Sequence, residues 1–464
     1  MSRHAGGLGI TGAIALAACL DGPVGVALAP APAIDAAALT VNAQNVLSAV
    51  VTVRVRDADS VSVQIHPAAD DSVTPASVPV DGVAMIPVLG LRPEERYALR
   101  AVAHGAGGTV VGDALELTTG SLPTDLPRYT AGGSDPSPGY VAFAAGMYGI
   151  VIDNTGRVVW YHRFASGAGL SFMAQPTGRY VARPPTPQAG DIEPWVELDA
   201  LGTITRTLGC ARGLSSRPHD LIGEADGSYW ILCDETRVMD LTAFGGMPDA
   251  RVTGTVVQHV SADSTLLFEW NPFDHFAITD VDDGERLGMS VNWMHGNALD
   301  FDADGNLLVS FRNLGEITKI DVSTGAVLWR LGGRRNQFTF LDTPMPAFAR
   351  QHSVRSYAGG GLVVLDNLGN PAESRAEHYI VDDMTRTARL VRSYASVPSV
   401  VTQIGGSVQP LANGRTLVSF GTEGRVVEYA ADGRVTWSVY GHAGYVFRAQ
   451  RIRSLYAPGV GTAR

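Results

Sequence analysis

The sequence ITKIDVSTGAVLW, residues 317–329, decides the fold. A strand-like run is followed by turn residues around Gly325 and by a second apolar run that ends in Trp329. This pattern predicts two antiparallel strands joined by a tight turn. Six such units recur along the chain, at Gly149–Trp160, Trp195–Thr207, Val256–Trp270, Ile317–Trp329, His378–Val391 and Arg425–Trp437. An internal repeat of this kind indicates an architecture built from similar small sheets.

Further strand-like runs lie between the copies, at Ser228–Cys233, Asn306–Phe311, Gly361–Leu365 and Thr416–Phe420. Two hairpins per copy make one four-stranded antiparallel sheet, which is the blade of a propeller. Six copies therefore predict a six-bladed β-propeller over residues 130–464. A TIM barrel would need helical patterns of about 10–15 residues between strands, and the sequence has none. A parallel β-helix would show a shorter and stricter period.

Residues 24–122 predict a separate β-sandwich, so the expected fold class is all-β. Val50–Arg56 alternates apolar and polar residues, as a half-buried strand does. Residues 87–123 resemble the last strands of a fibronectin type III domain, in which a tyrosine such as Tyr97 fixes a corner by hydrogen-bonding to the backbone. The proline-containing segment 121–130 is the expected linker.

Composition excludes several classes of protein. The 464 residues are 45% hydrophobic and only 17% charged, which is too apolar for a disordered chain. The net charge of −11 opposes nucleic-acid binding, which needs a basic face. Lys319 is the single lysine of the sequence and lies in a strand-like run. That excludes a Gly-Lys-Ser/Thr phosphate loop and opposes Schiff-base chemistry.

The N-terminus, residues 1–19, has the pattern of an export signal. Arg3 precedes a short apolar run, too short to span a membrane. The run ends in Leu16-Ala-Ala-Cys19, which resembles the bacterial lipoprotein cleavage box. The resemblance implies cleavage before Cys19 and lipidation of its thiol, whereas an ordinary signal peptide is the alternative. Either way we expect an exported protein, periplasmic or at the cell surface, that contacts a membrane only through a lipid anchor.

Two other cysteines, Cys210 and Cys233, each lie at the end of a strand-like run. An oxidising compartment permits a disulfide between them, and two buried free thiols are the alternative. Because the two cysteines flank His219, a bridge would hold the segment that presents this histidine.

Three histidines occupy similar positions in successive copies. His219, His295 and His352 each come just before a strand run, so we expect them to converge on the propeller axis. Asn297 and Arg312 lie in the same segments; turn, capping or ion-pair roles are the alternatives. Three histidines also suit Zn²⁺, but a neighbouring arginine would repel a metal. The calcium-like run 300–305 lacks the glutamate that closes such a loop. We therefore expect neither a metal nor a cofactor.

These segments resemble the bacterial arylsulfate sulfotransferases, which move sulfuryl groups between phenols without a nucleotide donor. The matching stretches are PHDL (218–221), MHGNALDFDADGNLLVSFRN (294–313), ITKIDVSTGAVLWRLGG (317–333), RQHSV (350–354), VVLDN (363–367) and FRAQRIRSLY (447–456). Ser353 departs from the family, where aspartate is usual. The family's closely spaced disulfide has no counterpart in this sequence.

The resemblance implies a role for each matching residue. His352 matches the nucleophile that becomes sulfohistidine, and the residues that hold the sulfuryl oxygens and assist proton transfer are matched by His219, His295, Asn297 and Arg312. It also implies an aryl sulfate donor, a phenolic acceptor and two half-reactions. Candidate walls for the aryl ring are Trp293, Phe348 and Tyr445. Two alternatives stay open: an aryl sulfate hydrolase with the same residues, and a non-catalytic propeller that binds ligands or proteins.

Overall fold

The computed structural model describes residues 29–67, 72–185 and 194–459, so the expected export signal and Cys19 lie outside the described residues. Strands dominate, and the helices are short 3-10 turns: η1 (Ala211–Gly213), η2 (Thr242–Phe244), η3 (Pro272–Asp274), η4 (Ile278–Asp280), η5 (Asp283–Arg286), η6 (Ala412–Gly414) and η7 (Gly421–Glu423). The part of the chain that the structure describes contains no helix that is long and apolar enough to cross a membrane. The expected all-β fold class is confirmed.

Two antiparallel sheets form the N-terminal part of the molecule. One has the order β1 (Ala33–Val41), β2 (Ala49–Arg56), β5 (Val83–Val88), and the other β4 (Ser72–Val73), β3 (Ser60–His66), β6 (Arg96–Gly105), β7 (Gly108–Thr118). Alternate residues of β2 are buried, as the sequence pattern predicts, and pack into the core between the sheets. The Tyr97 hydroxyl accepts a hydrogen bond of 2.8 Å from the Arg92 amide. This bond ties β6 to the turn before it.

Six further sheets follow, each built on four antiparallel strands, with a fifth strand added in three of them. Their strands are β9 (Tyr140–Ala145), β10 (Tyr148–Ile152), β11 (Val158–Arg163); β12 (Phe172–Ala174), β13 (Tyr180–Ala182), β14 (Trp195–Leu198), β15 (Ile204–Leu208); β16 (Ser215–Gly223), β17 (Tyr229–Met239), β18 (Ala250–Val260), β19 (Leu266–Trp270), β20 (Ser290–Asn292); β21 (Gly296–Phe301), β22 (Leu307–Phe311), β23 (Glu316–Ile320), β24 (Val327–Gly332); β25 (Thr339–Leu341), β26 (His352–Tyr357), β27 (Gly361–Asp366), β28 (Arg375–Asp382), β29 (Thr387–Ala395); and β30 (Ser407–Pro410), β31 (Thr416–Ser419), β32 (Val426–Tyr429), β33 (Val435–Val439).

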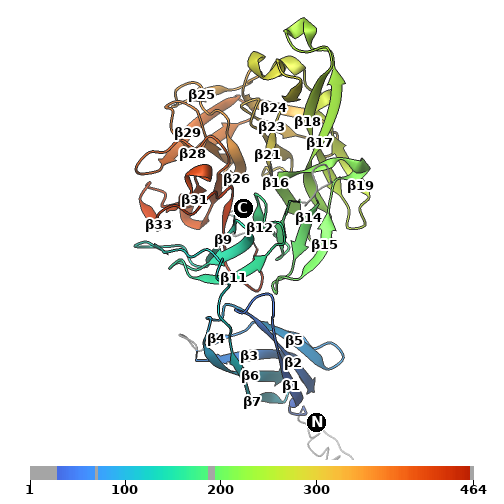
Figure 1. Ribbon diagram of the computed structural model, residues 1–464, viewed down its shortest axis with the longest axis vertical. Helices are drawn as coiled ribbons and strands as arrows, with labels where there is room; N and C mark the ends of the chain where they lie inside the picture. The colour runs from blue at the N-terminus through green and yellow to red at the C-terminus, as the bar shows by residue number, and fades with distance from the viewer. Residues whose placement is uncertain (1–28, 68–71, 186–193, 460–464) are drawn as a thin grey trace, which may run out of the picture.

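The six sheets form a propeller-like ring above the N-terminal sheets (Figure 1). Neighbouring inner strands touch along β16, β21, β26 and β30, and β34 (Ala449–Ile452) touches both β30 and β12. Between β12 and β16 the Ser171 hydroxyl donates to the Pro218 carbonyl at 3.0 Å. The residues at the start of each inner strand therefore face a common axis.

The chain ends close this ring. β34, from the C-terminal end, pairs with β9, and the short β8 (Ala131–Gly132) pairs with β33. The first and last sheets thus each combine strands from both ends of the repeat region. The repeat pattern in the sequence does not predict these two pairings, because β8 and β34 are far in the sequence from the hairpins that they join.

Each predicted strand pair is a hairpin in the structure, and residues 317–329 show why. They lie on β23 and β24, joined by a turn in which Asp321 Oδ1 accepts hydrogen bonds from the Ser323 and Thr324 amides at 2.8 and 2.9 Å. Gly325 has φ +74°, a conformation that glycine adopts without strain. The indole of Trp329 is 2% exposed and packs in the core between neighbouring sheets.

The expected linker, residues 121–130, packs against the ring. Leu126 is buried in the same apolar cluster as Leu47 and Val141, which come from the two parts that the linker joins. Across this junction the Val46 amide donates to Tyr161 Oη at 3.1 Å. The N-terminal sheets are therefore fixed to the ring by apolar contacts as well as hydrogen bonds.

Candidate active site

Three histidines meet where the inner strands of neighbouring sheets begin. His219 lies within β16, His295 immediately precedes β21, and His352 is the first residue of β26. The ring centroids of His219 and His295 are 4.9 Å apart, and those of His295 and His352 are 6.4 Å apart. Each histidine lies in, or directly before, the innermost strand of its sheet. The strand-like run that follows it in the sequence forms the neighbouring strand of that sheet. The phenyl ring of Phe447 lies beside His219 and His352, at 5.4 and 6.0 Å.

The backbone is strained at this cluster. His295 has φ +54°, Arg350 has φ +53° and Ser353 has φ +60°. Side chains other than glycine rarely adopt these left-handed angles, and each costs on the order of 1–3 kcal/mol. Strain at one histidine and on both sides of another is typical of residues held in place for function.

Arginines surround the histidines. Arg312 follows β22 and Arg350 precedes β26, and each donates a hydrogen bond of 2.9 Å to the same acceptor, Asn313 Oδ1. Glu285 pairs with Arg350 at 2.5 Å. The positive charges of two further arginines, Arg217 and Arg448, act on the histidine rings. Arg217, Arg350 and Arg448 also pair with carboxylates, but arginine charges still act on the histidine rings, which suits an anionic substrate.

Burial keeps the three imidazoles neutral. It lowers the pKa of His295 to about 2, with Arg217 adding to the effect. It also lowers the pKa of His352 to about 4, aided by Arg312 and Arg448. The pKa of His219 lies well below its ordinary value for the same reasons. For His352, burial and the charges of Arg312 and Arg448 are the causes that lower the pKa.

Asp220, the residue after His219, connects the histidine cluster to Arg355 and Arg448. Its carboxylate is 1% exposed and accepts hydrogen bonds of 2.8 and 3.0 Å from Arg448, 3.0 Å from Arg355 and 3.0 Å from the Leu299 amide. Burial alone would raise the pKa of Asp220, but Arg355 and Arg448 outweigh it and lower the pKa. Asp220 thereby connects its own strand β16 to β21, to β26 and to the residue before β34, and so joins four different sheets.

Asn297 is fully buried on β21 and connects two of the histidine segments. Its Nδ2 donates a hydrogen bond of 2.8 Å to the Gln351 carbonyl, next to His352. Asn297 Oδ1 and His219 Nδ1 are buried without a protein partner among the described residues. Unpaired buried polar atoms are costly, so these two atoms are candidate contacts for a ligand or a water molecule.

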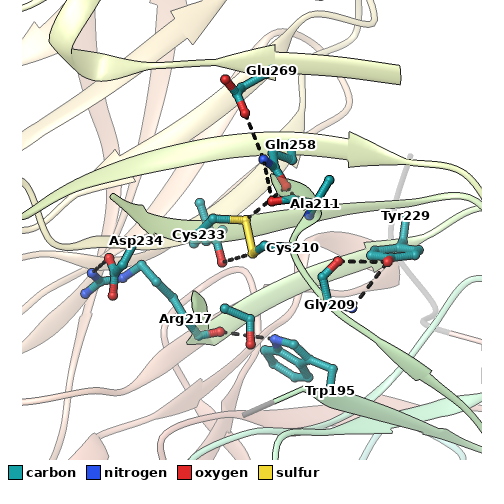
Figure 2. Close-up of a disulfide and its surroundings, with 12 residues drawn as sticks. Trp195, Gly209, Cys210, Ala211, Arg217, Tyr229, Cys233, Asp234, Gln258 and Glu269 are labelled. Atoms are coloured by element: carbon teal, nitrogen blue, oxygen red, sulfur yellow. Dashed lines mark hydrogen bonds and ion pairs between the residues drawn. A yellow bond between two sulfur atoms is a disulfide. The ribbon is translucent and has the colours of Figure 1, made fainter. Parts of the chain in front are cut away.

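Cys210 and Cys233 form a disulfide beside the His219 segment (Figure 2). Cys233 lies on β17 and pairs in register with Ser216 of β16, three residues before His219. Arg217 lies between Ser216 and His219 in the sequence. It pairs with Asp234 and donates a hydrogen bond of 3.0 Å to the Gly296 carbonyl. The disulfide and this ion pair together hold the start of β16 against β17 and β21.

The three expected aromatic walls lie in different environments. Trp293 is 1% exposed and packs in the apolar core against Phe273, so it does not line the cluster. Phe348 is also mostly buried, but it lines a cavity of about 310 Å³ that includes Arg312 and Arg350. Tyr445 is 38% exposed, and its ring packs closely against Gly405. A Cβ placed on Gly405 would lie only 2.5 Å from Tyr445 Oη.

Sequence reasoning missed several residues of this centre. Arg350 and Arg448 stand inside the segments RQHSV and FRAQRIRSLY, and Phe447 stands beside Arg448. Their position next to expected site residues was the available signal. That signal was too weak to identify them, because the contact that reveals the role of Arg448 is with Asp220, which is far away in the chain.

We expect kcat/KM for p-nitrophenyl sulfate, whose nitrophenolate can leave without a proton from the protein, to stay level from pH 8 down to about pH 5.5 and to fall with a midpoint near 4. The reason is that His352, the nucleophile that the resemblance implies, must be neutral to attack, and its pKa is lowered from 6.5 to about 4. The unfolded chain binds this proton first, so stability also falls as the pH drops from 6.5 towards 4. Initial rates between pH 3.5 and 8, with circular dichroism as the folding control, test this. A midpoint near 6.5 would contradict it.

Comparison with known proteins identifies the family. The arylsulfotransferase (ASST) family model matches residues 215–443. No curated protein matches the chain. A crystal structure of a protein of unknown function from Bacteroides caccae is 14% identical over 68% of this chain and 100% of that chain, with a TM-score of 0.45. A catalytically inactive virginiamycin B lyase from Staphylococcus aureus with quinupristin is 10% identical over 67% of this chain and 88% of that chain, with a TM-score of 0.38. Residues 215–443, which include the three histidines, Asn297 and Arg312, match the arylsulfotransferase family.

Proposed function

We propose that this protein transfers a sulfuryl group from an aryl sulfate ester to a phenolic acceptor, with His352 as the nucleophile. The single observation that carries the proposal is the cluster of three buried, neutral histidines surrounded by arginines. The match of residues 215–443 to the arylsulfotransferase family supports aryl sulfotransferase activity. The sulfohistidine intermediate and the identity of donor and acceptor are the parts that we add.

In the first half-reaction a ring nitrogen of His352 attacks sulfur, and an N–S bond forms. The bond between sulfur and the aryl oxygen breaks, and its electron pair leaves with that oxygen. Arg312 and Arg350 can stabilise the charge on the equatorial sulfuryl oxygens, as fixed donors do in phosphoryl transfer. In the second half-reaction the acceptor oxygen attacks sulfur, the N–S bond breaks and His352 is regenerated.

The leaving phenolate benefits from a proton, because a phenol has a pKa of about 10. His219 or His295 can supply it, although both rings are neutral in the free protein. The anionic donor offsets the arginine charges and raises the pKa of a neighbouring histidine, so this proton is taken up with the substrate. The acceptor phenol then returns a proton to the same ring, and the protons balance over the cycle.

We propose further that the ring of six sheets is a six-bladed β-propeller, residues 130–464, behind a fibronectin III-like sandwich, residues 24–122. The hydrogen bond of the Tyr97 hydroxyl at the corner before β6 supports the second assignment. We also propose that residues 1–19 direct export, with Cys19 lipidated and the protein periplasmic or at the cell surface. The disulfide between Cys210 and Cys233 supports an oxidising compartment.

The purified protein, mixed with p-nitrophenyl sulfate, should release nitrophenol rapidly only when a phenol is added, and phenyl sulfate should accumulate in equal amount. A histidine intermediate requires an acceptor before the enzyme can turn over again. Absorbance follows the donor, and mass spectrometry follows the product. Release that does not depend on phenol would instead establish a hydrolase. Absence of release with a panel of aryl sulfates would leave a ligand-binding propeller.

A further inference from the structure

We infer that Asn367 is a positioning residue that fixes the tautomer of His352, with the hydrogen on Nδ1 and the lone pair on Nε2. The inference rests on the proposed function, because it concerns how the nucleophile is prepared. Asn367 directly follows β27, and the paired strand β26 begins with His352. His352 Nδ1 and Asn367 Oδ1 are 2.8 Å apart, and both side chains are almost completely buried.

The orientation of the Asn367 amide follows from its other partners. Asn367 Nδ2 donates hydrogen bonds of 2.9 Å to the Thr402 carbonyl and 3.0 Å to the Gly405 carbonyl. Carbonyl oxygens only accept, so a flipped amide would place its own oxygen against two acceptors. The amide oxygen must therefore face the imidazole.

The tautomer follows in turn. An amide oxygen only accepts a hydrogen bond, so the 2.8 Å contact requires a hydrogen on His352 Nδ1. A neutral imidazole has one N–H, and burial keeps His352 neutral above a pKa of about 4. Nε2 then bears the lone pair and is the atom that attacks sulfur.

The support behind Asn367 is rigid. The Ser374 hydroxyl donates to the Asn367 carbonyl at 3.0 Å and accepts from the Thr402 amide at 2.7 Å. Gly405 has φ +71°, and its Cα faces Tyr445 so closely that no Cβ fits. The loop carbonyls that hold the Asn367 amide are therefore themselves held in place.

An amide suits this position better than a carboxylate does. A carboxylate behind the ring favours the imidazolium and raises the pKa of the histidine. A nucleophile must stay neutral, and an amide orients the ring without adding a negative charge. When the N–S bond forms, the ring becomes cationic and its Nδ1–H becomes a stronger donor, so the bond to Asn367 strengthens as the reaction proceeds.

The first test needs no substrate. In protein labelled with ¹⁵N-histidine, the His352 resonances, assigned by their loss in H352N, should show a protonated Nδ1 and an unprotonated Nε2 at pH 7.5. In Asn367→Asp, which keeps the shape of the side chain, the pKa of His352 should rise from about 4 towards or above 6.5. A wild-type ring with its hydrogen on Nε2, or an unchanged pKa in Asn367→Asp, would overturn the inference.

The second test measures chemistry. Asn367→Ala should slow sulfohistidine formation by about 10- to 100-fold, the loss that follows removal of a partner that orients a functional histidine. Asn370→Ala is the control, since this exposed amide donates to the Met345 carbonyl and not to His352. An Asn367→Ala rate equal to that of Asn370→Ala would count against a positioning role. If the wild type formed no sulfohistidine, the proposed function would fail, while the resonances of His352 would still decide the tautomer.

Discussion

Replacing His352 by asparagine should abolish phenol-dependent sulfuryl transfer, with a fall in kcat of at least about 10⁴-fold, because covalent catalysis loses its nucleophile. The side chain is 1% exposed, faces His295 and Phe447, and is oriented by Asn367. A single turnover with excess enzyme should release no nitrophenol. Peptide mapping of the wild type, quenched before acceptor is added, should find the sulfuryl group on the peptide that contains His352.

A matched control is available in His378. Its ring is also buried and also has a pKa lowered to about 4 by burial, but it lies on β28 and contacts Thr416 at 2.9 Å. His378→Asn should therefore keep transfer activity within a few-fold of the wild type while it perturbs a similarly buried ring. Retention of phenol-dependent transfer by His352→Asn would move the nucleophile to His295 or His219.

The repeat was predictable because each hairpin is specified locally. Residues 317–329 contain the turn residues, the strand residues and the buried tryptophan of β23 and β24, so no distant contact is needed to recognise them. Convergence of the histidines was predictable for a related reason. Residues at equivalent positions of a repeat face the same axis, whatever the details of the packing.

The rest of the site depends on contacts that no local pattern contains. Arg448 reaches Asp220 only because the C-terminal strand β34 closes the ring beside β9. The Asn367 amide finds its acceptors in a loop more than thirty residues further along the chain. Trp293 lies only two residues before His295, yet its side chain packs in the core against Phe273. Residues two apart on an extended strand would face the same side, but the chain bends at Met294 and His295 has φ +54°, so the two side chains differ in environment.

Replacing Asp220 by alanine should lower the free energy of unfolding by about 3–5 kcal/mol, the cost of breaking a buried ion pair. The carboxylate is 1% exposed and holds Arg448 by two hydrogen bonds and Arg355 by a third. Its removal takes from the buried Arg448 and the half-buried Arg355 the carboxylate that accepts their hydrogen bonds, so that only the more distant attraction of Asp300 remains. The urea midpoint of unfolding measures the loss.

The electrostatic origin of this loss can be separated from packing. Asp220→Asn keeps the volume and removes the charge, so most of the destabilisation should remain. Because the pKa of Asp220 is lowered in the folded protein, its contribution is present above the ordinary carboxyl pKa and disappears as the pH falls below it. The difference between wild type and Asp220→Asn should therefore shrink in acid. Asp35→Ala, which breaks an exposed pair with Arg56, should leave the midpoint unchanged. An Asp220→Asn protein as stable as the wild type at neutral pH would show that shape, and not charge, joins these four sheets beneath the histidines.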